Sequence, residues 1–222
     1  MSQQLRIVHH AVLYALICRA VCEHLGREEG EDLMERATFR YGFRRGRRMA
    51  KNAETHNGSK DLAGYFLYGE LNSRPGENSS SLEFQHDSTL SAVERCAWAD
   101  AWKQYGLWEY GRIYCRQVDA GLCTGYGGGF YLTVEETMGA GDERCLFRWS
   151  EGLTPEEQTS LEQKKAVLGN SVQKSYAFHC KELLDVVSEV LDAAGAPKEA
   201  ILSQAIMGAL FAGTFWIIGI PY

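Results

Sequence analysis

Two acidic residues lie where the sequence otherwise predicts apolar or tightly packed surfaces, and both could do acid–base chemistry. Glu136 falls on the apolar face of a predicted strand, where a charged carboxylate is costly to bury unless it is paired or its pKa rises. A raised pKa would suit a general acid or base near neutral pH. A salt bridge to Arg95, Arg116 or Arg148 is the alternative interpretation.

Asp119 is the second candidate, and it lies one helical turn after Cys115 on the helix predicted over 107–124. The two side chains therefore share one side of that helix. Asp119 could hold a substrate amine or amidinium, or it could act as a base on water. A buried cap or hydrogen-bond anchor for the glycine-rich loop that follows residue 124 explains the residue equally well.

Three cysteines in the same block, Cys96, Cys115 and Cys145, are candidate nucleophiles. A nucleophilic cysteine needs a base or a positive field to hold its thiolate. His86 is the histidine near the block, and its spacing from the three cysteines shows no Cys–His pair. The sequence therefore favours buried structural thiols over a thiolate.

Aromatic residues are dense around these side chains, and Trp98 and Trp102 stack at a spacing of one helical turn. Aromatic residues at helical spacing are usually core, but pockets for planar or cationic ligands have the same composition. We predict a pocket between a sheet and helices. Its catalytic residues are Glu136, Asp119, Cys115 and Cys96, and its substrate-binding residues are Trp98, Trp102, Tyr114, Tyr131, His86 and Cys145.

Composition and charge narrow the class of protein. The chain has 222 residues, of which 45% are apolar and 23% charged, and a net charge of −6 gives no support to nucleic-acid binding. Its seven cysteines show no metal-ligand spacing, so we expect no metal, no cofactor and a reduced, cytoplasmic protein without a signal peptide. The basic cluster from Arg36 to Lys51 is interpreted as a solvated helix face.

The periodicity predicts an α+β fold in one domain over 1–222. A helical part over 1–72 precedes an α+β core over 82–149, and a helical extension over 154–222 follows. A small antiparallel sheet is expected from strands at about 82–95, 130–138 and 144–149. Helices would cover one face of this sheet, and the C-terminal region would close the other. The predicted helices span about 5–26, 30–55, 60–71, 97–105, 107–124, 154 onwards, 171–194 and 198–218.

The C-terminal segment from Ala205 to Tyr222 carries no charge and approaches the length of a membrane span. It contains several glycines and a proline, and no basic residue follows it. A buried helix with an apolar arm is favoured over a membrane anchor. The sequence also permits a homodimer.

The block from 93 to 149 resembles the L-2-amino-thiazoline-4-carboxylic acid hydrolase family. The matching pieces are Arg95-Cys96-x-Trp98-Ala99, Gly106-Leu107-x-Glu109-x-Gly111, Cys115, Asp119, Gly125-Tyr126, Thr137-Met138, Gly141 and Cys145-x-Phe147-Arg148-Trp149. The last hairpin is also similar to vinyl-reductase-type small-molecule-binding domains. The family carries Gln where this chain has Glu136.

The resemblance implies an enzyme that opens a cyclic amidine or thiazoline ring by hydrolysis. One carboxylate would activate water for attack on the ring carbon while a second acid keeps the ring nitrogen protonated. Two alternatives stay open: a cyclase or isomerase of a natural-product intermediate on the same scaffold, and a non-catalytic module that binds a small molecule.

Overall fold

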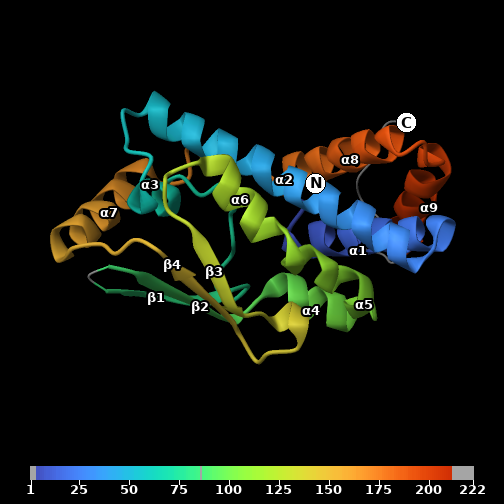
Figure 1. The fold of residues 1–222 in the computed structure, drawn as a ribbon, viewed down its shortest axis with the longest axis horizontal. Coiled ribbons are helices and arrows are strands. Elements are labelled where there is room, and N and C mark those ends of the chain that lie inside the picture. Colours follow the sequence, from blue (N-terminus) through green and yellow to red (C-terminus); the bar gives the residue numbers. More distant parts are fainter. Residues whose placement is uncertain (1–3, 86, 212–222) are drawn as a thin grey trace. The chain divides into compact units, whose positions relative to one another are not determined.

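The computed structural model describes residues 4–85 and 87–211, and the chain divides into two compact units (Figure 1). Unit 1 is formed by Met1–Ala37, Ala97–Tyr114 and Ser175–Tyr222, and unit 2 by Thr38–Cys96 and Cys115–Lys174. The two units interleave along the chain, whereas the sequence suggested three successive parts. That all 222 residues form a single domain stays a prediction.

Unit 1 is built around helix α1, Ile7–Leu25, in which residues 9 to 18 are all buried. Four other helices of this unit pack against α1: α4 (Ala97–Gln104), α5 (Trp108–Gly111), α8 (Tyr176–Ala193) and α9 (Lys198–Phe211). Burial on all sides explains why α1 is apolar around its whole circumference rather than along one stripe. Unit 1 also contains the first part of α2, Arg27–Thr55.

Unit 2 contains a four-stranded antiparallel sheet in the order β1-β2-β4-β3. Its strands are β1 (Ser79–Phe84), β2 (Thr89–Arg95), β3 (Leu132–Glu136) and β4 (Cys145–Trp149). The remainder of α2 belongs to this unit, together with α3 (Leu62–Leu67), α6 (Val118–Tyr126) and α7 (Pro155–Leu168). The α+β class predicted from the sequence is confirmed.

Two predicted elements are divided in the structure. The strand expected over 82–95 is two antiparallel strands, because the polar residues after Phe84 reverse the chain and the Gln85 amide donates to the Ser88 carbonyl at 2.8 Å. The helix expected over 107–124 is α5, a 3-10 turn at Arg112–Arg116, and α6. Gln117, with φ at −131°, separates the 3-10 turn from α6.

The C-terminal segment is described only in part. Helix α9 ends at Phe211 and so includes the first residues of the uncharged segment that begins at Ala205. Residues 212–222 lie outside the described residues. Among the helices that the structure describes, none is both long enough and apolar enough to cross a bilayer. Closure of the second sheet face by the C-terminal helices stays a prediction.

Helices α2 and α6 approach each other backbone to backbone within unit 2, and glycine makes this approach sterically possible. A Cβ atom on Gly46 would lie 2.1 Å from the Leu122 carbonyl oxygen, and one on Gly125 would lie 2.1 Å from the carbonyl oxygen of Phe43. The corresponding distances are 2.4 Å for Gly42, to the Val118 carbonyl oxygen, and 2.3 Å for Gly121, to that of Phe39. The spacing of four residues within each pair puts both glycines on the contact face of their helix.

Replacing Gly46 by alanine should therefore destabilise unit 2. The added methyl group forces the two backbones apart, and overpacking of this kind costs about 1–3 kcal/mol or more. Gly69→Ala is the matched control, because a Cβ there meets no atom within 4 Å. Thermal unfolding should show a lower Tm for Gly46→Ala and an unchanged or slightly higher Tm for Gly69→Ala. Equal Tm values for the two variants would contradict the close contact.

Candidate functional site

Asp119 lies in the first turn of α6, on the helix that packs against α2. Burial raises the pKa of its carboxyl group from 3.8 to about 6, and the guanidinium of Arg45 opposes that rise. The positive end of the helix dipole also favours a negative charge at this position. Asp119 is therefore a carboxylate that gains and loses its proton close to neutral pH.

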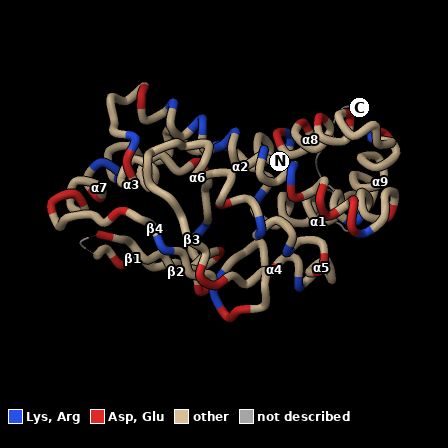
Figure 2. The backbone as a smooth tube through the Cα atoms, in the orientation of Figure 1, with Lys and Arg blue, Asp and Glu red and all other residues tan. Residues whose placement is uncertain are grey.

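The basic residues of α2 (Figure 2) are mostly exposed, as the solvated helix face predicted from the sequence requires: Arg36, Arg40, Arg47 and Lys51 all are. Arg45 is the exception, because it lies in a buried charge cluster. Only 4% of the Arg45 side chain is exposed, and its Nε lies 3.9 Å from Oε2 of Glu70, which is fully buried. Arg48 donates to both carboxylate oxygens of Glu70, at 2.8 and 2.9 Å. The bidentate ion pair with Arg48 largely neutralises the negative charge of Glu70.

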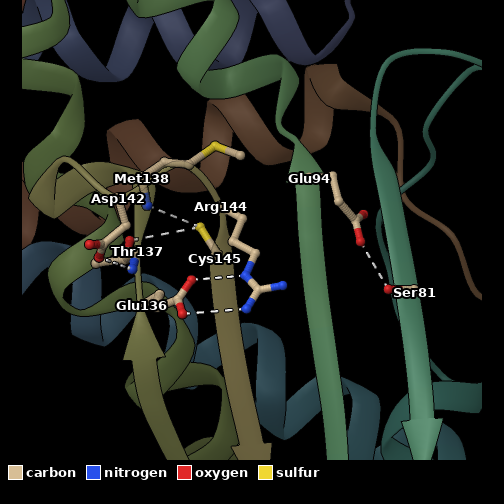
Figure 3. Close-up of polar contacts among 8 residues, drawn as sticks. All are labelled: Ser81, Glu94, Glu136, Thr137, Met138, Asp142, Arg144 and Cys145. Atoms are coloured by element: carbon tan, nitrogen blue, oxygen red, sulfur yellow. Dashed lines mark hydrogen bonds and ion pairs between the residues drawn. The ribbon is translucent and has the colours of Figure 1, made fainter.

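Three of the predicted cysteines are electrostatic neighbours within unit 2. Burial raises the pKa of Cys115 well above its usual value, and Cys96, Asp119 and Cys145 raise it further. The pKa of Cys145 is also raised, chiefly by burial. The Cys145 Sγ lies 3.4 Å from the Met138 amide that donates to it, and 3.8 Å from Oγ1 of Thr137 (Figure 3). The raised pKa values favour the neutral thiol form of Cys115 and Cys145.

Tyr65 of α3 was missed as a site residue. Burial raises the pKa of its phenol, and the charge of Asp119 raises it further. The Tyr65 ring packs edge-on against Tyr126 and Phe130, and its centroid lies 4.9 Å from that of Trp149. In sequence, Tyr65 is one of several aromatic residues of a short helix, and Arg45 is one of several arginines, so neither is distinguishable there.

The strand alternation that placed Glu136 on the buried face is wrong, because β3 contains a register shift. Val134 pairs with Phe147 of β4, but Glu136 pairs with Leu146, whose side chain points to the opposite face. Glu136 is 38% exposed and accepts a hydrogen bond from Arg144 Nε at 2.8 Å (Figure 3). The expected ion pair is therefore present, but its partner is Arg144.

The predicted substrate-binding residues are spread over both units. Trp98, Trp102 and Tyr114 lie in unit 1, where the Trp98 indole donates to His10 Nδ1 at 3.1 Å and the Trp102 indole donates to the Ala11 carbonyl at 2.8 Å. Tyr131 lies in unit 2 and is 66% exposed. His86 lies outside the described residues. Substrate binding by these side chains stays a prediction.

A cleft of about 760 Å³ opens between α3 and α7 in unit 2. None of the predicted catalytic or binding residues lines it. Its walls come from the turn that follows α2, from α3 and from one face of α7. Among residues 4–85 and 87–211, no group of three or more His, Cys, Asp or Glu side chains is placed to hold a metal ion.

Asp119, Arg45, Tyr65 and the thiol of Cys115 thus form one electrostatically connected group. It contains a carboxylate with a pKa near 6, a fixed cation and a protonated phenol. Such a group can take a proton from water and donate a hydrogen bond to a polar substrate atom. All four residues belong to unit 2.

Comparison with known families gives a match to L-2-amino-thiazoline-4-carboxylic acid hydrolase over residues 5–149, which include the whole Asp119 group. No curated protein and no solved structure matches significantly. The match covers more than half of the chain and confirms the resemblance carried by the block from 93 to 149. The chain belongs to the L-2-amino-thiazoline-4-carboxylic acid hydrolase family.

Proposed function

We propose that this hydrolase-like protein opens a cyclic amidine or thiazoline ring, with Asp119 as the general base. Membership of the family supports a hydrolase acting on a small molecule. The observation that carries the proposal is the partly buried Asp119, whose carboxyl group has a pKa raised to about 6, which suits proton transfer near neutral pH. Cyclisation or isomerisation on the same scaffold, and binding without catalysis, stay predictions from the sequence.

In the proposed reaction, the Asp119 carboxylate accepts a proton from a water molecule as the water oxygen attacks the carbon of the ring C=N group. A tetrahedral intermediate forms with its negative charge near the fixed cation of Arg45. The proton on Asp119 moves to the ring nitrogen of this intermediate. The ring C–N bond then breaks as the hydroxyl group of the intermediate gives its proton to Asp119, which passes it to the departing nitrogen, so a carbonyl group and a free amine are left. One water is consumed and no redox partner is needed.

The second acid that this mechanism requires is assigned to Tyr65 in place of Glu136. Burial and the charge of Asp119 raise the pKa of the Tyr65 phenol, so it stays protonated and can donate a hydrogen bond to the ring nitrogen. Glu136 is directed to the exposed face of the sheet and is engaged by Arg144.

Water is favoured over a cysteine as the nucleophile. A thiol attacks as its thiolate, and a thiolate needs a lowered pKa or an adjacent base. The pKa of Cys115 is instead raised well above its usual value by burial and by the neighbouring thiols and carboxylate. The pKa of Cys145 is also raised.

Asp119→Asn should lower turnover of L-2-amino-thiazoline-4-carboxylic acid by about 10²–10⁴-fold, because a general base contributes a factor of that size. Glu136→Gln is the matched control and should stay within a few-fold of the unmodified protein. Product that has gained one water is measured by mass spectrometry. A large loss of turnover in Glu136→Gln with normal turnover in Asp119→Asn would contradict Asp119 as the base and identify Glu136 as the catalytic carboxylate, as the sequence predicted. No turnover by the unmodified protein, with this compound or other cyclic amidines, would refute the proposal.

The titration of Asp119 should appear in both activity and stability. The base must be deprotonated, so kcat/KM should rise with pH to a plateau above about 6. Because the folded-state pKa is raised, the stability contribution of Asp119 is fully present below 3.8 and is lost as pH rises through about 6. Asp119→Asn should therefore be more stable than the unmodified protein at pH 8, by about 1–3 kcal/mol, and equal to it near pH 3.5. Denaturant unfolding at the two pH values checks this, and the opposite order at pH 8 would contradict the buried charge.

Cys115→Ser should retain turnover within about tenfold, because the attacking group in the proposed mechanism is water and a hydroxyl preserves the shape of the side chain. Single-turnover mass spectrometry of the intact protein should show no covalent adduct on the chain. Loss of turnover by more than about 10³-fold together with an adduct on the unmodified protein would identify Cys115 as the nucleophile instead.

A further inference from the structure

We propose that the cleft between α3 and α7 is a second ligand site, separate from the Asp119 group, which binds a small zwitterion with an apolar body. The carboxylate of the ligand would face Lys164, its ammonium group would face Glu157, and its apolar part would lie against Leu161 and Tyr68. Figure 1 shows the two helices side by side, and they contact each other within unit 2.

The size and walls of the cleft fit a small molecule. Its volume of about 760 Å³ lies within the range of about 300–1,000 Å³ that is usual for ligand pockets. Leu161 and Tyr68, each 4% exposed, supply apolar surface. The rings of His56 and Tyr68 pack with centroids 5.7 Å apart. The inner wall is therefore firm and partly aromatic.

The lining carries charges of both signs at separate places. Glu157 lies in the first turn of α7 and Lys164 lies seven residues later, which places their Cα atoms about 10 Å apart along one helix face. Lys164 forms no ion pair with Glu157 or with any other described residue. A ligand with one anionic and one cationic group can lie between the two side chains.

The two lining carboxylates have defined local roles that leave them able to bind a cation. Glu157 Oε2 accepts the Thr154 amide at 2.8 Å in the capping box of α7. Asp61 Oδ1 accepts the Gly64 amide at 2.8 Å at the start of α3. Each hydrogen bond fixes the orientation of a carboxylate, and an ionised carboxylate has further acceptor positions. The ammonium group of a ligand would therefore meet pre-oriented oxygens.

The site does not follow from the family match. The match ends at residue 149, and α7 begins at Pro155. None of Asp119, Arg45, Tyr65 or Cys115 lines the cleft. The zwitterion site can therefore fail while the proposed hydrolysis holds, and the reverse is also true.

The test is isothermal titration of the full chain at pH 7.5 with L-phenylalanine, which has both charges and an apolar side chain. N-acetyl-L-phenylalanine lacks the cation, and L-phenylalanine amide lacks the anion. We expect L-phenylalanine to bind more tightly than either derivative. Equal binding of one derivative would refute the zwitterion site, and so would no detectable binding of L-phenylalanine up to its solubility limit.

Paired variants locate the binding. Lys164→Gln should weaken L-phenylalanine binding about twofold to fivefold, since the charge pair is partly exposed, and Lys164→Arg should retain it. Lys165→Gln is the matched control, because this neighbour on α7 does not line the cleft. Glu157→Gln removes the negative charge while a glutamine can keep the capping bond, and it should weaken binding to a similar extent.

Asp119→Asn separates the two proposals. It should bind L-phenylalanine as the unmodified protein does, whether or not it has lost turnover. Weaker binding in Asp119→Asn with normal binding in Lys164→Gln would place L-phenylalanine in the Asp119 group and refute the second site. Identical affinities for Lys164→Gln, Lys165→Gln and the unmodified protein would refute it as well.

Discussion

The close approach of α2 and α6 is the constraint on which the candidate site depends. Helices normally pack with side chains between them at interaxial distances of 8–10 Å, but here the carbonyl oxygens of one helix occupy the space where a Cβ of the other would lie. Gly42 and Gly46 permit this on α2, and Gly121 and Gly125 on α6. Because the backbones are so near, Arg45 on α2 acts electrostatically on Asp119 of α6.

That contact creates a conflict between stability and chemistry. A carboxylate in a dense environment is costly to ionise, and the raised pKa of Asp119 expresses this cost. A surface aspartate would be more stable as an anion but a weaker base. Natural proteins keep such unfavourable groups where function needs them. The buried aromatic rings around Tyr65 supply favourable packing in the same unit.

The sequence predicted the α+β class and most elements, because these depend on local periodicity. The shared helix side of Cys115 and Asp119 stays a prediction, since the helix expected over 107–124 is divided between them at Gln117. It failed at Glu136, because period-2 alternation carries no signal for a register shift that depends on the partner strand. It also missed Arg45, since burial of one arginine among several is decided by tertiary packing against Glu70. The glycine spacing on α2 and α6 was visible in sequence, but only the pairing of the two helices gives it meaning.

Charge balance explains why Arg45 can act on Asp119. Two arginines of α2 lie beside the buried Glu70 in unit 2, of which Arg45 is buried and Arg48 is partly exposed. Arg48 makes both short hydrogen bonds to Glu70, while Arg45 lies 3.9 Å from it, beyond hydrogen-bond distance. The guanidinium of Arg45 also acts on Asp119, where its positive charge lowers the pKa of the carboxyl group and so favours the anion. The attraction of Arg45 for the Asp119 anion limits the rise that burial causes, so the carboxyl group has a pKa of about 6 and is mostly ionised at pH 7, ready to accept a proton.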